Sequence, residues 1–133
     1  MKEKKVTRLT KAEEQVMQIL WELGEAVVKD LMEHFEEPKP AYTTVATVLR
    51  VLEKKGFVSF RKVGNTYLYS PVVSKVEYTR FQVSRLLTNY FNGSFPKMAT
   101  FFARENDISI ADLENILKAA HQEMDNEKEN DHE

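Results

Sequence analysis

The first 56 residues alternate helical stripes of apolar residues with sharp breaks. A capping box at Thr10-Lys11-Ala12-Glu13 opens the first helix, because its hydroxyl and carboxylate can satisfy free N–H groups at a helix start. The apolar residues that follow have the spacing of one helix face: Val16, Ile19, Leu20 and Leu23. Gly24 then predicts the end of this helix.

The next segment predicts a short strand, a short helix, a turn and a third helix. The strand is Ala26-Val27-Val28, and the short helix carries Leu31, Met32 and Phe35. The two prolines in residues 36–40 indicate a turn, since proline stops helix propagation and restricts the residue before it. The third helix runs from about Tyr42 to Lys55, with its apolar stripe at Val45, Val48, Leu49 and Leu52.

A β-hairpin follows the third helix. Residues 57–63 and 66–71 are rich in aromatic and β-branched side chains, and Gly64-Asn65 between them is a two-residue turn signal. The order of helix, short strand, helix, turn, helix and hairpin is that of a winged helix-turn-helix. We therefore predict a mainly α fold with a small β-hairpin, followed by a C-terminal helical segment.

The C-terminal segment predicts three helices that cannot bury their own apolar side chains. A second capping box at Ser74–Glu77 opens a long helix to about Phe91, Asn92-Gly93 breaks it, and Ser94 and Ser109–Asp112 cap the next two. Apolar residues lie on most sides of the middle helix, so a partner subunit is the simplest cover, with a compact monomer as the alternative. The residues we expect at the dimer interface are Val83, Leu87, Tyr90, Phe102, Leu113, Ile116 and Leu117.

Charge is unevenly distributed and refines the expected domains. Residues 1–71 hold 12 Lys and Arg against 10 Asp and Glu, whereas residues 72–133 hold 7 against 11. The excess of acids comes from residues 125–133, which contain five acids and one lysine. We expect a winged-helix domain over 1–72, a helical dimerisation domain over 73–124 and an acidic disordered tail over 125–133.

The third helix carries the candidate chemistry on the face opposite its apolar stripe. Thr43, Thr47, Arg50 and Lys54 lie within about 60° of one another there, and Thr44 lies at the edge. Hydroxyl, guanidinium and ammonium groups suit base edges and phosphates in a DNA major groove. Arg61 and Lys62, beside the hairpin tip, would contact the DNA backbone. An ordinary solvated helix face is the alternative.

Several of these segments together resemble the BlaI/MecI family of penicillinase repressors. The segments are Thr10–Glu13 followed by Val16-Met17 and Leu20-Trp21, Tyr42–Val45, Leu49 with Leu52–Gly56, and the wing end Tyr67–Pro71. The similarity runs from about residue 7 to 122. It implies a winged domain that binds an operator and C-terminal helices that form a homodimer. Family members often have a basic residue at the wing tip, where this chain has Asn65.

The resemblance also implies a mode of regulation. In this family a membrane sensor metalloprotease, signalled by cell-wall damage or a β-lactam, cuts the repressor in its dimerisation domain. The matching bond here is Phe101–Phe102, where well-known members have Asn-Phe. Three possibilities remain open: a protease of different preference, a cut at a neighbouring bond between Met98 and Arg104, or no control by cleavage.

Two other functions fit the same pattern. A ligand-sensing regulator of the PadR or MarR type would have a cavity between dimer helices, lined by groups such as Tyr78 and Tyr90. A winged-helix protein-interaction module would bind no DNA. The chain has no cysteine, and its three histidines have no metal-ligand spacing. We expect no enzyme activity, no cofactor and no metal, and a cytoplasmic protein without membrane insertion, since no apolar run is long enough to span a bilayer.

Overall fold

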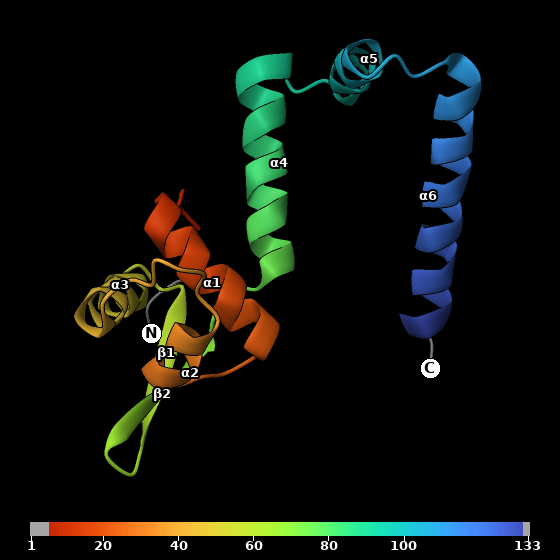
Figure 1. Cartoon of the computed structure of the whole chain (residues 1–133). Helices are drawn as coiled ribbons and strands as arrows, with labels where there is room; N and C mark the ends of the chain where they lie inside the picture. The colour runs from red at the N-terminus through yellow and green to blue at the C-terminus, as the bar shows by residue number, and fades with distance from the viewer. Residues whose placement is uncertain (1–5, 132–133) are drawn as a thin grey trace. The chain divides into compact units, whose positions relative to one another are not determined.

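The computed structural model of the chain, drawn in Figure 1, describes residues 6–131. The predicted fold class is confirmed, because this range forms a mostly helical chain with one antiparallel hairpin. It divides into two compact units, one up to Ser84 and one from Arg85. The elements are α1 (Lys11–Leu23), α2 (Val28–Glu33), α3 (Tyr42–Lys54), β1 (Val58–Val63), β2 (Thr66–Pro71), α4 (Lys75–Phe91), α5 (Phe95–Glu105) and α6 (Ile110–Asp131).

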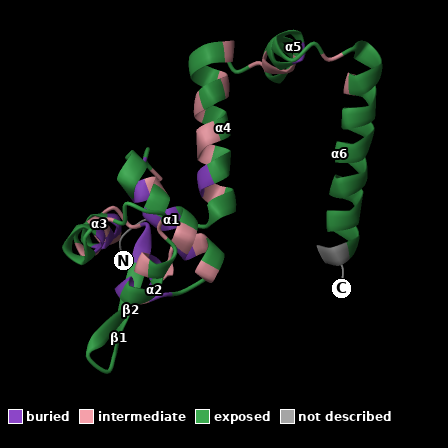
Figure 2. Cartoon of the chain, in the orientation of Figure 1, coloured by how far each residue is buried: buried purple, intermediate pink, exposed green. Residues whose placement is uncertain are grey.

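The core of the first unit lies where α1, α2 and α3 pack together with the base of the hairpin (Figure 2). The apolar stripes expected of α1 and α3 supply most of it. Its fully buried side chains are Val16, Met17, Leu20, Leu31, Val45, Leu49, Leu52, Phe57 and Val73. Burial of these side chains fixes which face of α3 is left for solvent.

The expected strand at residues 26–28 is reduced to one bridge. Ala26 exchanges both backbone hydrogen bonds with Tyr69 of β2, at 3.0 and 2.8 Å, and α2 then begins at Val28. The bridge ties the segment before α2 to the base of the hairpin. It thereby holds α2 beside the wing without a third strand.

Strands β1 and β2 pair in a simple antiparallel register around the Gly64-Asn65 turn. Phe60 lies opposite Tyr69, and Lys62 lies opposite Tyr67. Gly64 has φ +61°, which is the conformation that a type II′ turn requires at its first central position. The tip of the wing therefore lies at Gly64-Asn65, as the two-residue turn signal predicts.

The boundary between the two units lies within α4, twelve residues beyond the boundary that we expect from the sequence. The reason is the start of α4, where Tyr78 is buried in the core of the first unit and Phe81 packs against it. The first ten residues of α4 therefore belong structurally to the winged domain.

The second unit has almost no core of its own. Of residues 85–129, whose side chains the structure describes, Ala103 alone is buried, and α5 and α6 are largely exposed in Figure 2. Helix α6 continues to Asp131, through most of the stretch where we expect a disordered tail; residues 132–133 lie outside the described range. Glu127, Lys128 and Glu129 have good helix propensity and no glycine or proline interrupts them, which accounts for the difference.

Within the described range, no helix is both long and apolar enough to cross a membrane.

Candidate nucleic-acid interface

Helix α3 presents a polar face to solvent on the side opposite the core. Val45, Leu49 and Leu52 are buried, so the helix can rotate neither way without exposing them. The five α3 positions that we expect to contact DNA are all exposed: Thr43, Thr44, Thr47, Arg50 and Lys54. The structure thus brings these side chains to the solvent-exposed side of α3.

Local hydrogen bonds limit what the first turn of α3 can offer. The Thr47 hydroxyl donates to the Thr43 carbonyl at 2.8 Å, so its oxygen lone pairs and methyl group remain for another partner. Ala41 at the N-cap provides no side-chain hydrogen bond. N–H groups at the start of α3 therefore lack a side-chain cap and can meet an acceptor such as a phosphate.

The two basic residues of the wing lie on opposite faces of the hairpin. Successive strand residues point to opposite sides, so Arg61 shares one face with Leu68, and Lys62 shares the other with Phe60 and Tyr67. Both are exposed. The sequence predicts that both contact the DNA backbone, and the structure shows that their side chains leave the hairpin in opposite directions.

A groove of about 540 Å³ separates α3 from the wing. Tyr42, Ala46 and Arg50, spaced four residues apart on α3, form one wall. The aromatic face of the hairpin forms the other, with Phe60 and Tyr67 in edge-to-face contact at 5.0 Å and both about half exposed. The groove is lined by Val27, Val28, Lys29, Tyr42, Ala46, Arg50, Phe60, Asn65, Thr66, Tyr67 and Tyr69.

The groove contains residues that the sequence reasoning missed. Tyr42, Lys29 and Phe60 were not among the candidates. The four-residue spacing from Tyr42 through Ala46 to Arg50 could have identified Tyr42, whereas Lys29 and Phe60 lie on other elements and depend on the tertiary packing. No acidic side chain lines the groove, whereas Lys29 and Arg50 do. Its charge and its aromatic walls both suit an anionic ligand with planar or sugar groups.

Tyr69 closes the inner end of the groove as a core residue rather than as a binding residue. It is buried, and its ring lies 5.7 Å from that of Phe60. Burial raises the pKa of its phenol, although the nearby Arg50 guanidinium acts in the opposite direction. This burial makes Tyr69 a packing residue that is not available to stack on a base.

We searched residues 6–131 for side chains that could bind a metal ion together. Residues 6–131 contain no group of three or more His, Cys, Asp or Glu side chains placed to hold an ion.

Comparison with protein families gives a match over most of the chain. The model of the penicillinase repressor family matches residues 9–122, from the segment before α1 into α6. The chain belongs to the penicillinase repressor family. The resemblance drawn from its sequence motifs is thereby confirmed.

Known members of the penicillinase repressor family align with nearly the full length of this chain. The penicillinase repressor of Bacillus licheniformis is 21% identical over 127 residues, which are 95% of this chain and 99% of the relative. The methicillin resistance regulatory protein MecI of Staphylococcus aureus (strain N315) is 26% identical over 117 residues, or 85% and 95% of the two chains.

A solved structure supports the winged-helix architecture. The solution structure of the DNA-binding domain of the repressor BlaI matches with a TM-score of 0.50 and 25% identity. The match covers 57% of this chain and 94% of that domain. The extent agrees with a first unit that carries the family's winged helix.

The candidate dimer residues of this family member are spread over α4, α5 and α6. Val83, Tyr90, Phe102, Ile116 and Leu117 are exposed in the single chain, with 76% of Tyr90 and 60% of Leu117 accessible. Leu87 and Leu113 are partly buried. Phe101 and Phe102, the residues of the expected cleavage bond, are each 55% exposed within α5.

One premise of the ligand-sensor alternative is wrong. Tyr78, expected to line a cavity between dimer helices, is 4% exposed and lies in the core of the winged domain. Its position on the opposite side of α4 from Val83 and Leu87 directs it there. Tyr90, further along the same helix, is exposed.

Proposed function

We propose that the chain is a transcriptional repressor that binds a palindromic operator as a homodimer. The observation that carries the proposal is the exposed polar face of α3, set beside a basic wing on the fold of a penicillinase repressor. The likeness of the first unit to the DNA-binding domain of BlaI supports the same assignment. A repressor of this kind would act on DNA in the cytoplasm.

The residues of α3 and the wing would fall into two groups, those that contact bases and those that contact the phosphate backbone. Thr43, Thr44, Thr47 and Arg50 would meet base edges in the major groove, because hydroxyl and guanidinium groups match the hydrogen-bonding pattern there. Lys54 would neutralise a phosphate and so position the helix without reading sequence. Arg61 and Lys62 would act on the backbone flanking the major-groove contact.

The exposed apolar surface of the second unit supports the homodimer. Phe95, Phe101, Ile110, Ile116 and Leu117 are each at least half exposed in the single chain. Soluble monomers rarely leave so many large apolar side chains in water. We propose that a second copy covers them through the dimer residues named above.

Proteolytic release is the finer part of the proposal. Two winged domains joined by a dimer bind a palindrome far more tightly than one, through effective concentration. A cut between Met98 and Arg104 would separate the winged domain from most of the dimerisation helices and abolish this gain. The exposure of Phe101 and Phe102 supports access by a membrane sensor metalloprotease, the proposed partner.

A selection from random DNA followed by mobility shift tests the function. The full chain should enrich an inverted repeat, and the retarded band should contain two chains. Arg50→Ala should weaken binding to the selected site, whereas Arg80→Ala, which removes an exposed cation from α4, should not. Failure to enrich any sequence would leave the winged-helix protein-interaction module as the better assignment.

A further inference from the structure

The start of α4 is fixed to the winged domain by backbone hydrogen bonds. Three residues connect the end of β2 at Pro71 to the start of α4 at Lys75. In this connection the N–H groups of Val72 and Val73 both donate to the Phe57 carbonyl, at 2.7 and 3.2 Å. The connection is therefore held against the end of α3 and the base of β1, and does not behave as a flexible linker.

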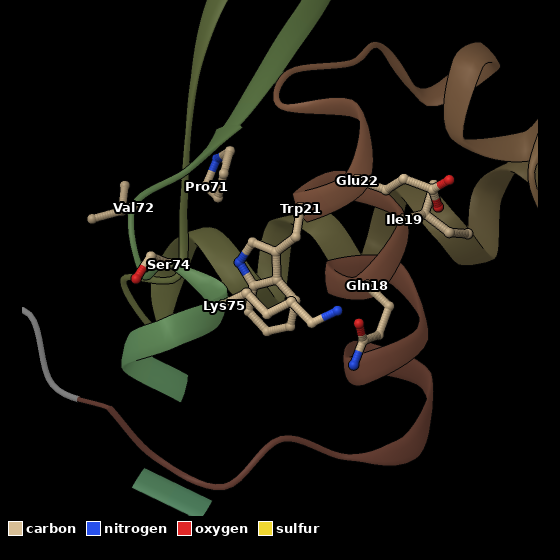
Figure 3. A pocket seen from close by; sticks show the side chains of 8 residues that line it. All are labelled: Gln18, Ile19, Trp21, Glu22, Pro71, Val72, Ser74 and Lys75. Carbon is tan, nitrogen blue, oxygen red and sulfur yellow. The ribbon is translucent and has the colours of Figure 1, made fainter. Parts of the chain in front are cut away.

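The first helix adds a second tie to the same connection. The indole N–H of Trp21 donates to the Val73 carbonyl at 2.9 Å. Figure 3 shows the indole nitrogen directed toward the segment between Val72 and Ser74, at one side of a groove of about 600 Å³. Ser74 then starts α4 with a reciprocal capping box. Its hydroxyl accepts from the Glu77 N–H at 3.0 Å, and its own N–H donates to the Glu77 carboxylate at 3.3 Å.

Tyr78 joins these parts to the segment that precedes α1. Its ring lies 5.9 Å from each of the rings of Trp21, Phe57 and Phe81. Its hydroxyl accepts a hydrogen bond from the Leu9 N–H at 3.0 Å, across 69 positions of sequence. One buried side chain of α4 thus contacts α1, the connection between α3 and β1 at Phe57, and the segment that precedes α1.

We propose that Tyr78 is a positioning residue that fixes the direction of α4 relative to α3, and thereby makes the dimer selective for the distance between operator half-sites. The inference rests on the proposed function, because only a dimer on two half-sites has a spacing to recognise. It does not concern a DNA contact, since Tyr78 is buried on the core side of the domain.

The length of α4 converts a small tilt at Tyr78 into a change of about one base pair. Tyr90, one of the candidate dimer residues, is twelve residues further along the same helix, which is about 18 Å at 1.5 Å per residue. A tilt of about 10° over this length moves that end by about 3 Å, close to the 3.4 Å rise between base pairs. Each protomer would add such a displacement.

We call the contacts of Tyr78 with Trp21, Phe57 and Leu9 the joint at the start of α4. Within this joint, the Tyr78 hydroxyl restrains the direction of α4 more than the ring does. Ring contacts tolerate sliding, whereas a hydrogen bond restricts both distance and angle. Without the hydroxyl the buried Leu9 N–H loses its acceptor, and the ring can shift between the Trp21 and Phe81 rings. Helix α4 would then sample a wider range of tilts while the recognition helix keeps its own packing.

The test compares full-length wild type with Tyr78→Phe on operators whose half-site spacing is changed in single base-pair steps. The operator comes from selection with the wild-type chain. Wild type should lose about tenfold or more in affinity when the spacing changes by two base pairs, since one half-site is then lost from the bivalent complex. Tyr78→Phe should keep affinity for the best spacing within about threefold, with the two-base-pair penalty reduced to about threefold or less.

The spacing profile separates positioning from stability. A general loss of stability lowers affinity for every spacing by the same factor, whereas a looser joint flattens the profile. Thr79→Ala, which removes a hydroxyl from the next, exposed residue of α4, should keep the wild-type profile. A Tyr78→Phe dimer with the sharp wild-type profile would overturn the inference.

Two further outcomes are also decisive. If circular dichroism shows that Tyr78→Phe does not fold, Trp21→Phe removes the other tie to the joint and must flatten the profile; a sharp profile there overturns the inference. A wild-type dimer that binds all spacings equally overturns it while leaving the proposed function intact. A wild-type chain that enriches no paired half-sites removes the proposed function itself.

Discussion

The ammonium of Lys55 lies 2.7 Å from one carboxylate oxygen of Glu13 and 2.9 Å from the other. This pair connects the C-cap of α3 to the first turn of α1, across 42 positions of sequence. Glu13 is 4% exposed and also completes the capping box with Thr10. The end of α3 is therefore anchored to the start of α1 by an ion pair whose carboxylate is buried and whose lysine side chain is partly exposed.

The Glu13 carboxylate should make stability depend on pH in the acid range. Burial raises its pKa, but hydrogen bonds from Lys55 and Thr10 outweigh this, so the pKa lies below its ordinary value of 4.5. A folded-state pKa below the unfolded value gives stability that is present above about pH 4.5 and is lost as pH falls through the folded pKa. Chemical denaturation of wild type between pH 3 and 7 should show this loss.

Glu13→Gln isolates the charge, because glutamine retains an oxygen that can accept from the Thr10 N–H. The substitution should lower the free energy of unfolding by about 1–2 kcal/mol at pH 7 and remove much of the acid dependence. Glu14→Gln, one position along α1 and without an ion pair among those described, is the matched control. Equal acid dependence in Glu13→Gln and wild type would mean that other carboxylates dominate.

Local patterns predicted the helices and hairpin because caps, stripes and turns are each encoded within a few residues. The capping box at Thr10–Glu13 and the turn at Gly64-Asn65 formed where the sequence placed them. The partner of Glu13 could not be predicted, since Lys55 approaches it only after α1 and α3 pack. The position of Tyr78 could not be predicted for the same reason. Helical spacing gave the side of α4 on which it lies, but not that this side packs into the core of the winged domain.

The polar face of α3 was predictable from local sequence, whereas the groove beside it depends on tertiary packing. Periodicity alone put Thr43, Thr47 and Arg50 on one exposed face, because a stripe and its opposite face follow from the helix repeat. The groove that Arg50 shares with Phe60 depends on how α3 packs against the wing. Sequence spacing therefore found the helix face but missed the opposite wall.

Substitutions on α3 should separate base reading from phosphate binding. Thr47→Ala and Arg50→Ala should each weaken binding to the selected operator by about 1–3 kcal/mol per lost base contact, with less effect on random DNA. Lys54→Ala should weaken binding to both DNAs and reduce the salt dependence by about one phosphate contact. Fluorescence anisotropy at several salt concentrations measures both effects. Wild-type operator affinity in both Thr47→Ala and Arg50→Ala would show that α3 is not the recognition helix.

The two wing cations should differ because they lie on opposite faces of the hairpin. Lys62 shares the face of Phe60 and Tyr67 that borders the α3 groove, whereas Arg61 lies on the other side. Lys62→Ala should therefore weaken operator binding more than Arg61→Ala does, although arginine is the stronger phosphate ligand. Anisotropy titrations of both variants on one operator provide the comparison. A larger loss from Arg61→Ala would mean that the opposite face of the wing meets DNA.

A charge on the exposed face of α6 should prevent assembly. Leu117 is 60% exposed in the single chain and is one of the candidate dimer residues. Leu117→Glu should give monomers and a loss of operator affinity, because burying the carboxylate at an interface costs several kcal/mol. Sedimentation velocity measures assembly, and the circular dichroism of the winged domain should stay unchanged. Lys118→Glu, at the neighbouring exposed position, is the charge control; a stable wild-type monomer at micromolar concentration contradicts the dimer.

Cleavage within α5 should release the repressor from DNA if control follows the family's pattern. Phe101 and Phe102 are exposed, but they lie inside a helix that Ser94 caps through the Lys97 N–H. A protease needs an extended strand, so α5 must unwind locally before the bond can be cut. A helix with few buried contacts allows this at low cost. Cell-wall stress in the native host should therefore yield a fragment that ends between Met98 and Arg104, detectable by immunoblot and mass spectrometry.

Phe101→Pro, which disrupts the α5 backbone at the matching bond, should change the rate or position of the cut. Phe95→Ala, near the helix start, serves as the control for lost apolar surface. A repressor that stays full length while its target genes are transcribed would exclude this mechanism and leave release by a ligand as the alternative.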